Sequence, residues 1–127
     1  MDTTILIVDD NTADQQIMAR LLKENGFKNL SFAATAQEGY TKALEEKPDV
    51  IIMDTVLPDK DGFSLCYALS QKKGLKSFKV LLTGHVQAID TARASEAGAD
   101  KYIVKTSNYR MLLTALEKLV DDSDNVV

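Results

Sequence analysis

Two kinds of segment alternate along the chain, and this alternation is the feature that most limits the folds it can adopt. Five short runs are apolar and rich in β-branched residues: 5–8, 30–33, 50–53, 80–82 and 102–104. Runs of this kind are typical of strands that are buried on both faces of a sheet. Longer segments with apolar residues at helical spacing separate them. Strands that alternate with helices predict βα units and a parallel sheet with helices on both faces.

The expected helices are bounded by recognisable start and stop signals. They cover residues 12–25, 35–46, 63–72, 86–97 and 107–120. Thr12 and Thr35 are candidate N-caps, and Glu38 stands at capping-box spacing from Thr35. Asn25 and Gly26 form a plausible C-terminal stop for the first helix. We therefore predict a doubly wound α/β fold with five parallel strands and five helices.

Length and composition predict one ordinary globular domain. The chain has 127 residues, of which 45% are hydrophobic and 27% charged, so it can bury a core of its own. We expect the domain to span residues 1–120, and residues 121–127 to form a frayed polar tail or the start of a linker.

Charge and residue usage exclude several classes of protein. The net charge of -4 argues against direct nucleic-acid binding, which normally requires a basic patch. Cys66 is the only cysteine, so the chain can form neither an intrachain disulfide nor a multi-cysteine metal site. No stretch has the length of a membrane span, and the N-terminus does not read as a signal peptide. We expect a cytoplasmic protein.

Side chains with useful chemistry follow four of the predicted strands. They are Asp9 and Asp10 after the first strand, Asp54 after the third, Thr83 and Gly84 after the fourth, and Lys105 after the fifth. The carboxyl ends of parallel strands meet at one edge of the sheet, where open α/β folds bind their ligands. Any one strand-ending Asp is more often a turn or cap residue. Complementary groups at four strand ends are hard to explain in that way.

The chemistry of these groups points to phosphoryl transfer. Three carboxylates held close together would repel, and at least one would be pushed toward protonation. A magnesium ion would remove the conflict, because Mg²⁺ prefers oxygen ligands and typically combines one or two carboxylates with a phosphate. Lys105 could pair with an anionic oxygen, while Thr83 and the Gly84 amide could contact a ligand. An aspartate would then serve as the nucleophile.

At these residues the chain resembles the response-regulator receiver domain of two-component signalling. The resemblance runs from Thr4 to about Val120. The matching motifs are Asp9-Asp10, Asp54 with Leu57-Pro58 behind it, Asp61-Gly62, Thr83-Gly84, and Tyr102-Ile103-Val104-Lys105. It implies a CheY-like fold with the strand order 2-1-3-4-5.

The resemblance implies that Asp54 is the phosphoacceptor. Its carboxylate would attack the phosphohistidine of a sensor histidine kinase or of a phosphotransfer protein. Asp10 would bind Mg²⁺ directly, Asp9 largely through water, and Asp54 and the Val56 backbone carbonyl would complete the set. Such a domain catalyses its own phosphorylation and dephosphorylation, but it is a signalling switch rather than a turnover enzyme.

Further residues acquire roles by the same resemblance. Lys105, Thr83 and the backbone of Val56 and Gly84 would contact the phosphoryl oxygens. Thr83 would move toward the phosphoryl group, and Tyr102 would change rotamer inward. The face made by the fourth helix, fifth strand and fifth helix would then change its affinity for a downstream protein or an attached output domain.

Two positions are expected to tune how fast the phosphoryl group is lost. Val56 and His85 stand two residues after Asp54 and Thr83, and both would flank the phosphoryl group. The plainer interpretation of His85 is an exposed loop histidine. A homodimer through residues 86–120 remains open.

One departure from the family pattern keeps a second function open. The family usually has Pro directly after the lysine, behind a cis peptide, whereas this chain has Thr106. A cis bond before a residue other than proline costs about 2.5–4 kcal/mol, and the sequence does not decide between cis and trans here. The alternative function is a receiver-like docking module that works without phosphorylation.

Overall fold

The sheet has the predicted architecture. The computed structural model describes residues 2–84, 88–105 and 108–124. In this part of the chain, five parallel strands form one sheet in the order β2-β1-β3-β4-β5. The strands are β1 (Thr4–Val8), β2 (Asn29–Ala33), β3 (Val50–Asp54), β4 (Phe78–Thr83) and β5 (Lys101–Val104). The predicted fold class and strand order are confirmed.

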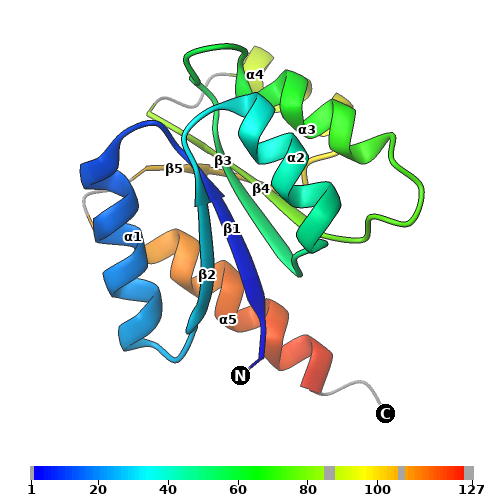
Figure 1. Cartoon of the computed structure of the whole chain (residues 1–127). Helices are drawn as coiled ribbons and strands as arrows, with labels where there is room; N and C mark the ends of the chain where they lie inside the picture. The colour runs from blue at the N-terminus through cyan, green and yellow to red at the C-terminus, as the bar shows by residue number, and fades with distance from the viewer. Residues whose placement is uncertain (1, 85–87, 106–107, 125–127) are drawn as a thin grey trace.

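Helices cover both faces of the sheet. They are α1 (Thr12–Glu24), α2 (Ala36–Glu46), α3 (Gly62–Ser70), α4 (Ala88–Glu96) and α5 (Arg110–Asp124). Figure 1 shows α1 and α5 on one face and α2, α3 and α4 on the other. Among the described residues, no helix is long and apolar enough to cross a membrane.

Two hydrophobic clusters lie on opposite faces of the sheet. Leu6 and Val8 of β1 belong to the cluster beneath α2, α3 and α4. Ile5 and Ile7 belong to the cluster that includes residues of α1 and α5. Successive side chains of a strand point to opposite faces, so a strand buried on both sides must be apolar at every position. This pattern explains why the strands read as continuous apolar runs.

The helix caps agree with the sequence signals, with two corrections. Thr35 caps α2 by accepting a hydrogen bond from the Glu38 amide, but the Glu38 carboxylate reaches the Ala34 amide and not that of Thr35. The cap of α1 is Asn11, whose side chain accepts from the Asp14 amide; the prediction of Thr12 was wrong. Asn and Thr are both favoured N-cap residues, so the sequence alone did not decide whether Asn11 or Thr12 caps the helix.

All five helices differ from their predicted bounds, α1 and α2 by a single residue at one end. Helix α3 ends at Ser70 and α4 at Glu96, earlier than predicted, and residues 86–87 lie outside the described part. Helix α5 begins at Arg110 and continues through Asp124, so its predicted end at residue 120 was wrong. Polar residues can extend an established helix, because each adds a backbone hydrogen bond without a new nucleation cost.

Candidate functional site

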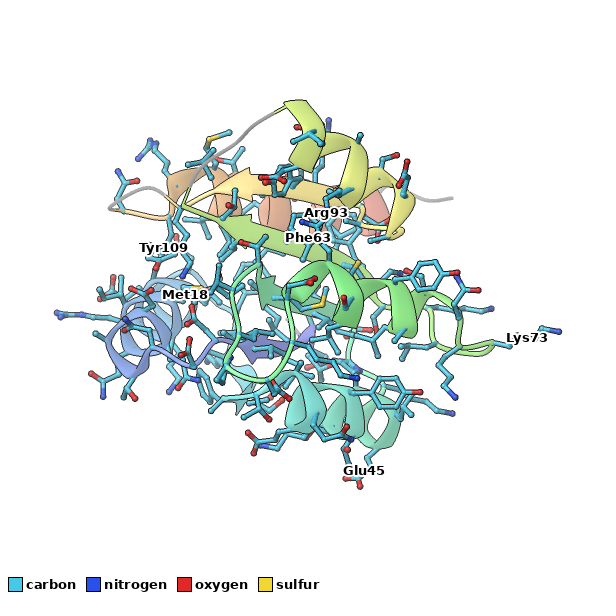
Figure 2. All side chains as sticks on the ribbon, turned by 90° about the horizontal axis from the view of Figure 1, so that it is seen from above. Met18, Glu45, Phe63, Lys73, Arg93 and Tyr109 are labelled. Carbon is cyan, nitrogen blue, oxygen red and sulfur yellow. The ribbon has the colours of Figure 1, made fainter. Side chains whose placement is uncertain are left out.

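The predicted site residues converge at the carboxyl edge of the sheet. Asp9 and Asp10 follow β1, and Asp54 ends β3. One carboxylate oxygen of each lies within 4.8 Å of the others. Figure 2 looks down on this edge from above. Hydrophobic packing of two neighbouring strands therefore brings together three acids that are up to 45 residues apart in sequence.

Lys105 lies among these carboxylates. Its Nζ atom is 2.8 Å from Oδ2 of Asp54 and 3.1 Å from Oδ2 of Asp9. It is also 3.0 Å from Oδ2 of Asp14, in the first turn of α1. We expected Lys105 to pair with an anionic oxygen of a ligand; here it joins three carboxylates of the protein itself. The three contacts match the three donors of an ammonium group.

Asp9 is the most buried member of the cluster. It is 1% exposed, and its Oδ1 accepts a hydrogen bond from the Asn11 amide at 2.9 Å. Burial raises the pKa of this carboxyl above its ordinary value, although the Asn11 amide and Lys105 act in the opposite direction. Repulsion from Asp54 contributes least of the causes. The prediction that crowding would drive protonation therefore had the correct sign, but burial is the leading cause.

The carboxylates around Lys105 keep its side chain protonated. Burial opposes an ammonium ion, but hydrogen bonds to Asp54, Asp14 and Asp9 outweigh it and raise the pKa of Lys105 above its usual value. Lys105 is therefore a permanent cation at neutral pH, which suits a group that must neutralise an incoming anion.

The loop after β3 fixes the Asp54 carboxylate. The Val56 amide donates to Oδ1 of Asp54 at 3.0 Å, and the Thr55 amide donates to the Leu82 carbonyl at 2.9 Å. Gly62 packs directly against this backbone, since a Cβ atom there would lie 2.1 Å from the Asp54 carbonyl oxygen. The Val56 side chain points outward and is 74% exposed, beside the acid that it is expected to influence.

Thr83 and Gly84 lie at the end of β4, next to Asp54. Residues Asp54 and Leu82 pair across the two strands, and the Lys105 amide donates to the Thr83 carbonyl at 2.7 Å. Thr83 is buried. A Cβ atom on Gly84 would meet no described residue within 4 Å, so open space lies beside this backbone in the described part of the chain.

Tyr102 packs into a chain of contacts that reaches the loop after Asp54. Its ring centroid lies 5.9 Å from that of Phe63. The Arg93 guanidinium lies over the Phe63 ring at 4.2 Å and 3.7 Å from Asp61; Figure 2 shows Arg93 and Phe63 together. Tyr102 is half-buried, so its ring already contacts the core side of the structure.

Sequence reasoning assigned no role to three residues whose surroundings the structure shows. Asp14 accepts a hydrogen bond from Lys105, and Tyr109 is buried near that acid, whose charge helps to raise the pKa of the phenol. Asp59 accepts hydrogen bonds from the Ala36 and Gln37 amides at the start of α2. An acid in the first turn of a helix commonly stabilises the helix N-terminus, so the sequence did not indicate that Asp14 has any further role. Two predictions, the tuning role of His85 and the geometry of the peptide before Thr106, lie outside the described residues.

The donor set can hold a hard cation. Carboxylate oxygens are the ligands that Mg²⁺ prefers, and one or two suffice. The oxygens of Asp9, Asp10 and Asp54 are close enough to share one ion, and Asp10 is exposed to solvent, which provides access.

Comparisons with known proteins agree on one family. The family model described as response regulator receiver domain matches residues 5–117. The chain is 31% identical to the alkaline phosphatase synthesis transcriptional regulatory protein PhoP of Bacillus subtilis, covering 98% of this chain and 51% of the relative. It is 33% identical to the response regulator protein VraR of Staphylococcus aureus, covering 93% and 56%. The chain thus spans about half the length of these curated relatives.

A solved structure gives the same result for the fold. The CheY-like response regulator receiver domain protein of Methanospirillum hungatei superimposes with a TM-score of 0.83 at 33% identity. The match covers 96% of both chains.

Proposed function

This chain belongs to the response regulator receiver domain family, and from that membership we propose that Asp54 accepts a phosphoryl group from a partner phosphohistidine. A carboxylate oxygen of Asp54 forms a bond to phosphorus as the phosphorus–nitrogen bond breaks. The imidazole leaves with the bonding electron pair and takes up a proton. The product is an acyl phosphate on Asp54.

The observation that carries this proposal is the position of Lys105. An ammonium 2.8 Å from Asp54 lies where negative charge would accumulate during transfer. Phosphoryl transfer needs positioning and charge neutralisation more than covalent help, and strands β3 and β5 supply both groups from rigid elements.

Magnesium is the expected cofactor. Asp9, Asp10, Asp54 and the Val56 carbonyl would hold the ion. When bound, Mg²⁺ supplies positive charge to the phosphoryl oxygens. The fit rests on the three carboxylates that lie within 4.8 Å of one another.

Other groups of the chain would receive the phosphoryl oxygens. Lys105 and the Thr83 hydroxyl are the expected side-chain partners, and the amides of Val56 and Gly84 the backbone ones. The Val56 amide already donates to Asp54. The open space beside Gly84 allows a ligand to approach the backbone. Val56 and His85 remain the candidates for tuning dephosphorylation.

The signal would leave the site through Thr83 and Tyr102. A shift of Thr83 toward the phosphoryl group would favour an inward rotamer of Tyr102, whose ring contacts Phe63. The α4-β5-α5 face would then change its affinity for a downstream protein or an attached output domain. A sensor histidine kinase or phosphotransfer protein is the expected donor. Residues 1–120 would form this unit, with residues 121–127, of which 121–124 continue α5, as a tail or the start of a linker.

Beryllofluoride with Mg²⁺, a mimic of the acyl phosphate, provides the test. We expect amide NMR shifts at Thr83, Gly84, Tyr102 and Lys105 in the wild type and none in Asp54→Ala. Asp122→Ala removes an exposed acid at the far end of α5 and should behave as the wild type. No shifts in the wild type would reject the phosphoacceptor role, and would favour the docking module that works without phosphorylation.

A further inference from the structure

Asp14 contacts the site lysine although it stands outside the cluster of acids that could hold a metal. Its Oδ2 is 3.0 Å from Nζ of Lys105, a distance comparable with those of Asp9 and Asp54. The side chains of Lys105 and Asp14 are 18% and 29% exposed. This ion pair is therefore partly shielded from solvent, unlike a typical surface pair.

Tyr109 is a buried neighbour of Asp14, since the Asp14 charge is among the causes that raise the pKa of its hydroxyl. Tyr109 is 5% exposed and belongs to the same core cluster as Met18 of α1, and Figure 2 shows the two close together.

We propose that Asp14 is a positioning residue, which holds the Lys105 ammonium at the crevice. The inference rests on the proposed function. Asp9 and Asp54 are expected to serve the metal and the phosphoryl group, so their oxygens are shared between tasks. Of the three carboxylates, Asp14 is the one that is not expected to bind the metal or the phosphoryl group. It can therefore keep the Lys105 ammonium in place while Asp9 and Asp54 bind those ligands.

Neutralising Asp14 while preserving its shape is the direct test. In Asp14→Asn, the rate of phosphorylation by acetyl phosphate at saturating Mg²⁺ should fall about tenfold, the usual size of losses when a supporting partner of a site residue is removed. Glu24→Gln removes an exposed charge from the same helix and should leave the rate unchanged.

Double mutants separate positioning from a general structural effect. If Asp14 acts through Lys105, Asp14→Asn should change nothing further once Lys105→Ala is present, because coupled residues are not additive. A rate in Asp14→Asn equal to or above that of the wild type would overturn the proposal. A full additional loss in the Lys105→Ala background would do the same.

A second measurement needs no phosphodonor. The ¹⁵N-edited NMR signal of the Lys105 ammonium, assigned by its absence in Lys105→Ala, should shift in Asp14→Asn but not in Glu24→Gln. An unshifted signal would overturn the positioning role. If the wild type is not phosphorylated but the ammonium signal shifts, the proposed function fails while the role of Asp14 stands.

Discussion

The Nζ atom of Lys105 lies 2.8 Å from Oδ2 of Asp54, although 51 positions separate the two residues in sequence. Asp9 and Asp14 accept from the same ammonium, so one cation compensates three carboxylates. This arrangement predicts how the protein responds when the cation is removed.

Lys105→Met should destabilise the metal-free protein. Removing one partner of a buried ion cluster leaves the carboxylates uncompensated, and we expect the free energy of unfolding to fall by about 3 kcal/mol. Mg²⁺ should restore more stability to this variant than to the wild type, because no ammonium competes for Asp9 and Asp54. Urea unfolding with and without Mg²⁺ measures both effects. Lys101→Met, at an exposed position of the same strand, is the control, and an equal Mg²⁺ effect in all three proteins would contradict the prediction.

Gly62→Ala should strongly destabilise the fold and disturb Asp54. The new Cβ atom would lie 2.1 Å from the Asp54 carbonyl oxygen and 3.0 Å from the Thr55 Cα atom, and neither backbone atom can move away alone. We expect a loss of about 3 kcal/mol, at the upper end for overpacking. Gly84→Ala meets no described residue within 4 Å and should be nearly neutral for stability. Thermal unfolding of both variants decides the matter, and equal melting temperatures would refute the steric argument.

Tyr109 should make the protein sensitive to alkaline pH. Burial, followed by the Asp14 charge, raises its pKa to about 12, whereas the unfolded chain ionises near 10. A raised pKa contributes stability that is complete below the unfolded value and is lost as pH rises through the folded one. The difference in unfolding free energy between wild type and Tyr109→Phe should therefore shrink between pH 10 and 12. If the difference in unfolding free energy stays constant across this range, folding does not raise the pKa of the Tyr109 phenol and the prediction is wrong.

Asp59 should contribute to stability above acidic pH. Hydrogen bonds from the Ala36 and Gln37 amides lower the pKa of its carboxyl, so folding favours the ionised form. Such a contribution is present above the unfolded pKa and disappears as pH falls through the folded one. Asp59→Asn should be less stable than the wild type at pH 7, and the two should converge below about pH 4. Urea unfolding at both pH values tests this, with Asp122→Asn as a control that should show no such convergence.

The strands and the main acids were readable from the sequence. Apolar runs such as 50–53 must be buried on both faces, which requires a parallel sheet with helices on either side. That topology places Asp9, Asp54 and Lys105 at one edge without any knowledge of coordinates. The family resemblance added the strand order and the expected roles of these residues.

The ends of the helices were harder to predict from the sequence, because neighbouring residues compete for the capping position. Asn11 and Thr12 are both good caps, and only the backbone conformation of Asn11, with φ of -88° and ψ of 109°, decides between them. The end of α5 is another example, since its polar last turn carried no stop signal before Asp124.

The sequence by itself determined the fold class and which acids meet at the sheet edge. Apolar runs alternate with amphipathic segments along the chain, and this alternation implies parallel strands whose carboxyl ends share one edge. Only the tertiary structure decided what those acids contact. It placed Asp14 beside Lys105, the Tyr109 ring in the core cluster shared with α1, and the Asp59 carboxylate on the first amides of α2. Each of these contacts joins two elements across the fold, and its geometry follows from how helices and loops pack rather than from any spacing along the chain.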